Sequence, residues 1–125
     1  MTENEISNII IREAINVHKI LGPGLLEKVY IEALYHKLVQ CGLEVFKEYP
    51  CPIIYEEIKI ECGYRVDLFV ADKVIVEAKS IDQIAEIHVA QTLTYLRLSR
   101  RKLGLIINFN VRLLKNGIKR VVNNL

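Results

Sequence analysis

The sequence predicts an α/β fold in which one β-sheet is flanked by helices. Two stretches with helical spacing of apolar residues come first, four short stretches of strand character follow, and a third helical stretch precedes an apolar C-terminal part. Apolar residues at intervals of three and four indicate helices, whereas alternation and short apolar runs indicate strands. With 125 residues and no internal repeat or linker, residues 1–125 are expected to form a single domain.

The N-terminal part predicts two helices. The first covers residues 4–21, where apolar side chains recur at three and four positions. The Gly-Pro-Gly sequence at residues 22–24 ends it, because proline and glycine resist continuation of a helix. The second helix is expected over residues 25–41, with Gly42 as its C-terminal cap.

The middle of the chain changes to strand character. Strands with short connections are expected over residues 43–47, 53–60, 64–70 and 74–78. Pro50 and Pro52 lie between the first two, and proline within a sheet favours an edge position or a break.

The C-terminal part predicts one helix over residues 83–101 and a compact apolar strand over residues 103–109. In the tail, Asn116-Gly117 is typical of a tight turn, and the flanking residues 112–114 and 118–122 are expected to pair as a hairpin. The expected order is therefore two helices, four strands, one helix and two or three strands, ααββββαββ(β).

Composition excludes several classes of protein. Half of the residues are hydrophobic (51%) and 26% are charged, as in ordinary globular domains. The net charge is only +2, so any binding of nucleic acid must come from a local patch. Three cysteines, an odd number without a Cys-x-x-Cys pair, argue against a disulfide framework and a zinc ribbon, and Cys41 and Cys51 are expected to be reduced thiols.

The N-terminus carries acidic and amide side chains before its first apolar stretch, unlike a secretory signal. No apolar run approaches the roughly 20 residues that a membrane-spanning helix needs. We therefore expect a cytoplasmic protein that does not enter a membrane.

Three charged side chains interrupt the apolar pattern of neighbouring strands. Side chains two apart in a strand share a face, so Glu77 and Lys79 lie with Ile75. Asp67 opposes the apolar face that Val66 and its alternating neighbours form, and a tight hairpin would place it beside Glu77. Two carboxylates and an ammonium group on an apolar sheet are costly to desolvate unless they pair or bind a metal.

The helices add further candidates. Glu27 opens the second helix within its apolar arc, although an acid in the first turn is also favoured by the helix dipole alone. In the third helix, His88, Gln91 and Tyr95 are three and four residues apart and line one side. Taken singly, a structural role is favoured for each of these three residues.

Taken together, these pieces resemble a known pattern. A helical Glu27, a strand Asp67, Glu77-x-Lys79 and Gln91-x-x-x-Tyr95 occur in the order found in the PD-(D/E)XK nuclease superfamily, and the Gln-Tyr pair resembles its RecB-like branch. Residues 24–30 (GLLEKVY), which end at Tyr30, resemble the motif that names the GxxExxY family within that superfamily. Two departures are Val66 in place of the proline of the superfamily motif, and Ala78 where a larger aliphatic residue is usual.

The resemblance implies a restriction-endonuclease-like fold and a nuclease that uses Mg²⁺ or Mn²⁺, hard cations that prefer oxygen ligands. It implies that Asp67, Glu77 and the Ala78 carbonyl bind the metal, with Glu27 acting through water or at a second metal. Lys79 would act on the attacking water and the phosphate charge. Supporting roles fall to the remaining residues of the pattern: Gln91, Tyr95, His88 and Tyr30.

The expected partner is nucleic acid, DNA in preference to RNA. A basic cluster at the end of the third helix is a candidate contact, although basic residues there also complement the helix dipole; it comprises Arg97, Arg100, Arg101 and Lys102. A chain of this size has no separate specificity domain, so a homodimer or a larger partner would supply target choice. Two alternatives stay open: a nucleic-acid-binding or assembly module without turnover, and a structural salt-bridge network around Lys79.

Overall fold

The computed structural model describes residues 1–61 and 64–125. Cys62, one of the three cysteines considered above, lies outside the described residues. Cys41 and Cys51 are free thiols, in agreement with the prediction. No helix in the described part of the chain is long and apolar enough to cross a lipid bilayer.

The fold is a mixed α/β fold of the restriction-endonuclease-like type, as predicted. The elements are α1 (Glu3–Leu21), α2 (Glu27–Gln40), β1 (Val45–Pro50), β2 (Ile53–Tyr55), β3 (Ile58–Ile60), β4 (Arg65–Val70), β5 (Val74–Lys79), α3 (Glu86–Ser99), β6 (Leu103–Asn108), the 3₁₀ helix η1 (Leu114–Gly117) and β7 (Ile118–Val122).

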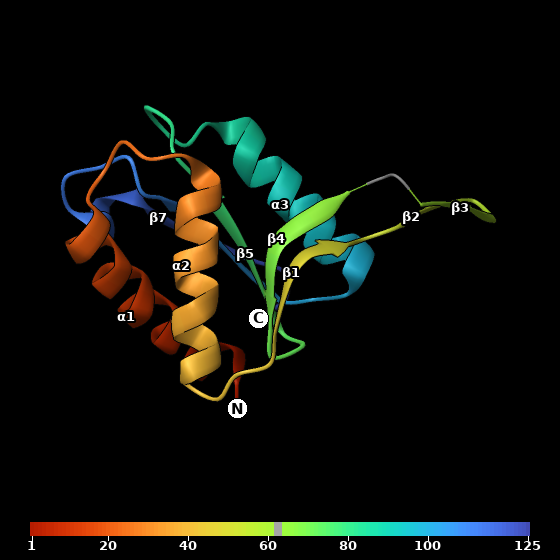
Figure 1. Ribbon diagram of the computed structural model, residues 1–125. Coiled ribbons are helices and arrows are strands. Elements are labelled where there is room, and N and C mark those ends of the chain that lie inside the picture. Colours follow the sequence, from red (N-terminus) through yellow and green to blue (C-terminus); the bar gives the residue numbers. More distant parts are fainter. Residues whose placement is uncertain (62–63) are drawn as a thin grey trace.

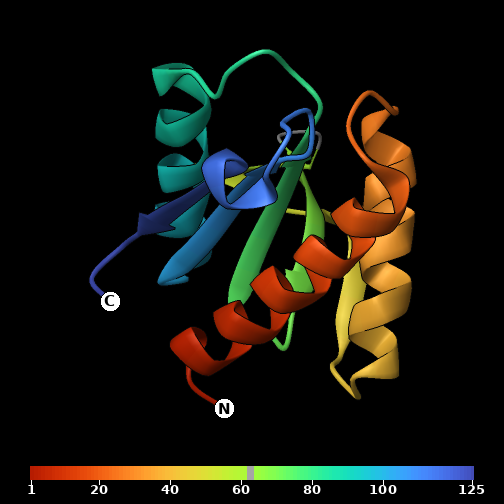
Figure 2. The same ribbon diagram turned by 90° about the vertical axis from the view of Figure 1, so that its left-hand side faces the viewer.

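The central sheet has five strands in the order β1-β4-β5-β6-β7. Strands β5 and β6 are parallel and are joined by α3, whereas the other neighbours are antiparallel. Helices α1 and α2 cover one face of the sheet and α3 covers the other (Figures 1 and 2). Strand β1 is an edge strand that ends at Pro50, as its proline content predicts.

The two faces of the sheet bury separate apolar clusters. On the α1/α2 face, Val74, Val76 and Ala78 of β5 pack in one cluster with residues of both helices. On the α3 face, Ile75 packs with Tyr95 and other residues of the second cluster. Strand β6 is buried throughout, which explains why its sequence reads as a continuous apolar run.

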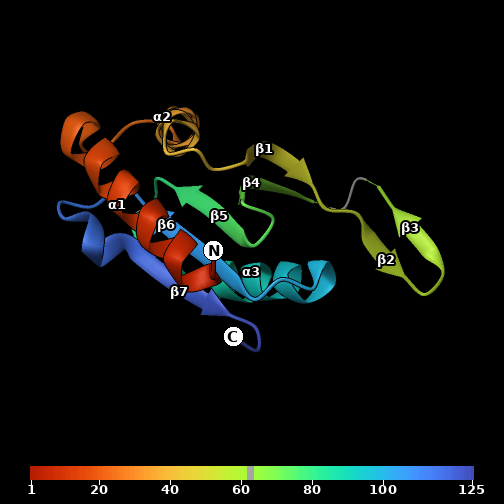
Figure 3. The same cartoon turned by 90° about the horizontal axis from the view of Figure 1, so that it is seen from below.

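The predicted strand over residues 53–60 is wrong in one respect. Strands β2 and β3 form a two-stranded hairpin that turns at Glu56 and Glu57, with Ile53 paired with Ile60. Glu56 has a φ of 55°, a conformation that glycine or asparagine usually supplies, so the residues at this position carry no turn signal. The hairpin projects away from the central sheet (Figures 1 and 3).

The predicted tail hairpin is also wrong. Asn116 and Gly117 belong to the 3₁₀ helix η1, and only residues 118–122 form a strand, which pairs with β6. The favoured two-residue hairpin turns need positive φ at the first or at both central residues, and neither Asn116 nor Gly117 has it. Gly117 instead allows a close approach of the chain to the Asn108 carbonyl, where a Cβ atom would clash.

Helix boundaries follow the sequence signals. Helix α1 begins with a capping box between Thr2 and Glu5. The prediction for Gly42 is confirmed: it lies just after the C-cap residue Cys41 of α2 and has a φ of 84°, as expected for a glycine that ends a helix. Helix α3 is shorter than predicted, because it begins only at Glu86 and ends at Ser99.

Candidate active site

The candidate site lies where β4 and β5 separate. Their pairing ends at Leu68 and Val76, so the next residues of the two strands are no longer joined by the sheet's backbone hydrogen bonds. Oδ2 of Asp67 accepts a hydrogen bond of 2.8 Å from the Ala78 amide and takes the place of the missing backbone partner. The Asp67 carboxylate thus lies between β4 and β5 where the two strands are no longer paired.

The Asp67 and Glu77 carboxyl groups are neighbours, and each affects the pKa of the other. Glu77 is 6% exposed, and Oε1 of its carboxylate accepts a hydrogen bond from the Tyr64 hydroxyl. The sequence analysis expected this proximity from a tight hairpin between the two strands. Tyr64 had no sequence signal, because its position relative to Glu77 depends on where the strands diverge.

Burial shifts the acid–base properties of this pair. Burial raises the pKa of Asp67, against the lowering effect of the Ala78 amide and of Lys79. Burial, and then the charge of Asp67, raise the pKa of Glu77 to about 8. Burial and the neighbouring Glu77 likewise raise the pKa of Tyr64. Simultaneous ionisation of both carboxyl groups is therefore disfavoured in the protein alone.

One expectation about this strand is wrong. Val66 was placed on the same apolar face as Leu68, but it packs in the α3-side cluster with Phe69. The pairing of β1 with β4 skips the position of Glu48 and Asp67, and Glu48 has a φ of 49°. This local distortion interrupts the alternation that the sequence argument assumed.

Glu27 reaches the end of β5 from α2. It is the first residue of that helix, and its Oε2 accepts a hydrogen bond of 3.1 Å from the Ser80 amide. The Ser80 hydroxyl donates to the Leu25 carbonyl at 2.7 Å. The charge of Glu27 also raises the pKa of Asp67, in addition to the larger effect of burial. The three predicted carboxylates thus lie around the same end of the sheet.

Asn108 holds the segment after β5 from the opposite side, a role that the sequence argument missed. It is 2% exposed, its Oδ1 accepts from the Ile81 amide at 3.1 Å, and its Nδ2 donates to the Ile81 carbonyl at 2.9 Å. Asn108 also pairs with Lys79 across the parallel strands. A polar residue inside the apolar run of β6 was the available signal.

Tyr30 positions the turn before Glu27. Its hydroxyl donates to the Gly22 carbonyl at 2.6 Å and accepts from the Leu25 amide at 3.1 Å. Its ring is fully buried and stacks on Phe109 with centroids 4.4 Å apart. Tyr30 therefore supports the site through the turn rather than by lining it.

Lys79 ends β5 and is partly exposed. Its charge lowers the pKa values of Asp67 and Glu77 against the larger effect of burial, so it acts on both carboxyls. Yet none of the ion pairs in residues 1–61 and 64–125 includes Lys79. Lys79 is thus near Asp67 and Glu77 but forms no ion pair with either in the described structure. This observation disfavours the alternative of a structural salt-bridge network.

The predicted residues of α3 divide into two groups. Tyr95 is buried, stacks on Tyr64, and has a raised pKa because of burial, partly offset by Gln91 and Tyr64. The Nδ1 atom of His88 accepts a hydrogen bond of 2.9 Å from the Ala85 amide and so caps the start of α3. The structure brings Tyr95 toward the carboxylates and gives one nitrogen of His88 a local structural role.

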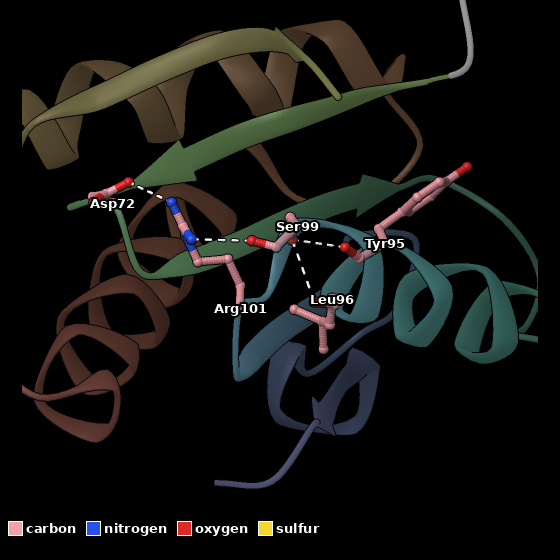
Figure 4. Close-up of polar contacts among 5 residues, drawn as sticks. All are labelled: Asp72, Tyr95, Leu96, Ser99 and Arg101. Atoms are coloured by element: carbon pink, nitrogen blue, oxygen red, sulfur yellow. Dashed lines mark hydrogen bonds and ion pairs between the residues drawn. The ribbon is translucent and has the colours of Figure 1, made fainter. Parts of the chain in front are cut away.

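The basic cluster lies at the other end of the sheet. Because Val74 pairs with Leu103 and Lys79 with Asn108, residues that precede β6 lie a strand's length from Lys79, roughly 16 Å. Arg101 is engaged there: Nη2 binds Asp72 at 2.8 Å and Nη1 binds the Ser99 carbonyl at 3.0 Å (Figure 4). The other three members of the cluster are exposed.

The donor set fits a hard divalent cation. Burial disfavours ionisation of the two adjacent carboxyl groups, a bound cation would favour it, and oxygen donors suit Mg²⁺ and Mn²⁺. Across the part of the chain that the structure describes, no three His, Cys, Asp or Glu side chains form a metal-holding group. A site here would therefore combine two carboxylates with backbone and water oxygens.

Comparison with known proteins decides the family. A family model described as the PD-(D/E)XK nuclease superfamily matches residues 4–121. The chain belongs to the PD-(D/E)XK nuclease superfamily. The match includes all the acids of the candidate site and both helices that frame it. No curated protein and no solved structure matches the chain.

Membership gives the site a chemical context. Proteins of this superfamily are generally nucleases, typically use divalent metal ions, and take nucleic acid as substrate. The acids around the end of β5 lie on the elements that the sequence motif assigned to them. Membership thus suggests a nuclease, and the acids around the end of β5 are its candidate site.

Proposed function

We propose that this protein is a metal-dependent nuclease that hydrolyses phosphodiester bonds of DNA, with RNA as the other candidate substrate. The observation that carries the proposal is the adjacency of the Asp67 and Glu77 carboxylates beside Lys79 at the point where β4 leaves β5. Within the superfamily, we assign the chain to the GxxExxY family and its Gln-Tyr pair to the RecB-like type, on the sequence motifs alone.

Asp67, Glu77 and the Ala78 carbonyl would hold a Mg²⁺ or Mn²⁺ ion, and Glu27 would act through a bound water. The ion would supply stabilisation of negative charge on the phosphate and a lowered pKa of water. Glu27 is fixed for its role by its bond to Ser80, and Asp67 by its bond to Ala78. Positions held by such bonds need little rearrangement when substrate binds.

Lys79 would orient the attacking water and offset the charge on the phosphate through Nζ. Its freedom from an ion pair in the described structure leaves the ammonium group available. Tyr64 orients Glu77 through its hydroxyl, and Tyr95 stacks on Tyr64. Gln91, beside Tyr95, is exposed and would contact the substrate backbone.

A cleavage assay with Mg²⁺ or Mn²⁺ on single- and double-stranded DNA and RNA tests the proposal. We expect cleavage that EDTA abolishes and that Asp67→Ala and Glu77→Ala remove. The alternative is a module that binds nucleic acid or an assembly partner without turnover. Binding of nucleic acid without cleavage of any of the four substrates in either metal would favour that alternative.

A further inference from the structure

The β2–β3 hairpin exposes apolar side chains on both strands. Ile54 is 58% exposed, and Tyr55 and Ile58 are each 62% exposed. The hairpin pairs only within itself and contributes no residue to either apolar cluster. An isolated two-stranded hairpin is marginally stable in water, and a projecting apolar surface marks an interaction site.

The charge on the hairpin excludes the obvious ligand of a nuclease. Its turn carries Glu56 and Glu57, and no ion pair in the described part of the chain includes either of them. Lys59 pairs with Glu61, so it does not neutralise the turn. An acidic tip repels phosphate groups. The hairpin therefore fits a protein surface that is apolar and basic.

The chain itself has a surface of that kind. A pocket of about 310 Å³ lies between the sheet and α3. It is lined by apolar and aromatic side chains that include Tyr49, Phe69 and Leu98, by Ile54 at the base of the chain's own hairpin, and by Arg101. Arg101 also lines a neighbouring hollow, which we call the basic hollow, formed with Arg97, Arg100 and Lys102. Leu98 and Tyr49 are partly exposed at the pocket.

We infer that the partner of the hairpin is a second copy of this chain: the hairpin of each protomer lies against the pocket of the other, with Glu56 and Glu57 facing the basic hollow. Twofold symmetry makes the contact reciprocal, so each chain gives one hairpin and receives one. Two such contacts enlarge an interface that one hairpin alone would leave small. This use of the basic hollow also accounts for its distance from the carboxylates.

Charge reversal tests the pairing. Wild-type protein at micromolar concentration is expected to have the mass of a dimer by light scattering. Glu56→Lys/Glu57→Lys and Arg97→Glu/Arg100→Glu should each weaken dimerisation by at least roughly tenfold, because each places like charges opposite one another. An equimolar mixture of the two variants should restore the dimer, since both hairpin contacts in the mixed dimer join opposite charges.

Glu44→Lys and Arg112→Glu are matched controls, since both alter exposed charges elsewhere and should leave the dimer mass unchanged. Lys79→Ala should also remain dimeric, so the result is independent of the proposed nuclease activity. Thermal melts establish that each variant is folded. A monomeric wild-type protein, or a mixture no more dimeric than its components, overturns the inference. So does a loss of nucleic-acid binding by the reversed variants without any change in mass.

Discussion

Lys79 is the residue whose removal separates catalysis from binding. We predict that Lys79→Ala retains binding of metal and nucleic acid and loses turnover, mainly in kcat, because the ammonium group acts on the water and the transition state. Metal binding should be unchanged or slightly stronger, since a positive charge is removed from the neighbourhood of the cation. A cleavage assay beside a binding assay measures both.

Denaturation of the same variant tests the structural alternative. If Lys79 held Glu77 or Asp67 in a buried ion pair, its loss would cost roughly 3–5 kcal/mol of stability. Because Lys79 has no ion pair in the described residues, we expect a much smaller change. Lys119→Ala, an exposed lysine on β7, is the control and should keep full turnover. A large loss of stability without wild-type activity would favour the structural alternative.

Glu77 gives the metal-free protein a pH dependence. Because its pKa rises from 4.5 to about 8 on folding, the folded state holds this proton more tightly than the unfolded state. The contribution of the Glu77 carboxyl to stability is therefore present at low pH and is lost as the pH rises from 4.5 to about 8. We predict that urea denaturation in EDTA gives a free energy of unfolding that falls by a few kcal/mol from pH 5 to pH 8.

Glu77→Gln should remove most of that slope, because glutamine stays neutral across this range. At pH 8 without metal, the variant should be more stable than the wild type. Glu44→Gln, a change at an exposed acid, should leave the slope unchanged. An equal slope in Glu77→Gln and wild type would show that another group carries the pH dependence.

At the scale of the elements, residues 80 and 81, which follow β5, are held by side chains from two other elements. Glu27 holds the Ser80 amide from α2, and Asn108 holds both backbone groups of Ile81 from β6. We predict that Asn108→Ala destabilises the protein by about 1–3 kcal/mol, since it leaves buried backbone groups without partners. Because the same segment follows Lys79, the variant should also bind Mn²⁺ more weakly.

Asn4→Ala is the matched control for that prediction. Asn4 is exposed and its side chain accepts a hydrogen bond from Arg120 at the surface, so its loss should change stability by no more than about 0.5 kcal/mol. Calorimetry with and without Mn²⁺ measures stability and metal affinity in one series. A destabilised Asn108→Ala with unchanged affinity for Mn²⁺ would limit Asn108 to a role in folding.

The sequence predicted the elements where one periodicity dominated. Helical spacing located α1, and alternation placed Glu77 on the face of Ile75. Periodicity did not locate features that depend on local distortion of the backbone. The turn at Glu56 uses an unfavourable residue, and Val66 changes faces where Glu48 has positive φ. Periodicity assumes regular backbone, so it is least informative where strands diverge.

The same limit applies to the candidate site. Asp67, Glu77 and Lys79 stand out in the sequence because charge interrupts an apolar pattern within short strands, and their roles stay predictions. Tyr64 and Asn108 act through contacts between segments that are 13 and 27 residues apart in sequence. Such contacts depend on strand order and register, which one sequence does not specify. The acids of a site were thus easier to predict than the groups that hold them.

At the scale of the whole molecule, the site connects the two layers of helices through the sheet. Glu27 comes from α2 on one face, whereas Tyr95 of α3 packs on the other, and β4 and β5 lie between them. A cation bound to Asp67 and Glu77 would offset repulsion at the centre of this assembly. Metal binding should therefore increase the free energy of unfolding of the whole protein.

We predict that Mn²⁺ or Mg²⁺ raises the Tm, because binding to the native state increases the free energy of unfolding by about 2.7 kcal/mol at a hundredfold excess over Kd. Asp67→Ala and Glu77→Ala should abolish the shift, because each removes a ligand, whereas Glu44→Ala should keep it. Differential scanning calorimetry over a metal titration measures the effect. A Tm that ignores both metals, alone and with a non-hydrolysable oligonucleotide, would mean that the carboxylates are structural. A shift with oligonucleotide only would mean that the phosphate completes the ligand set.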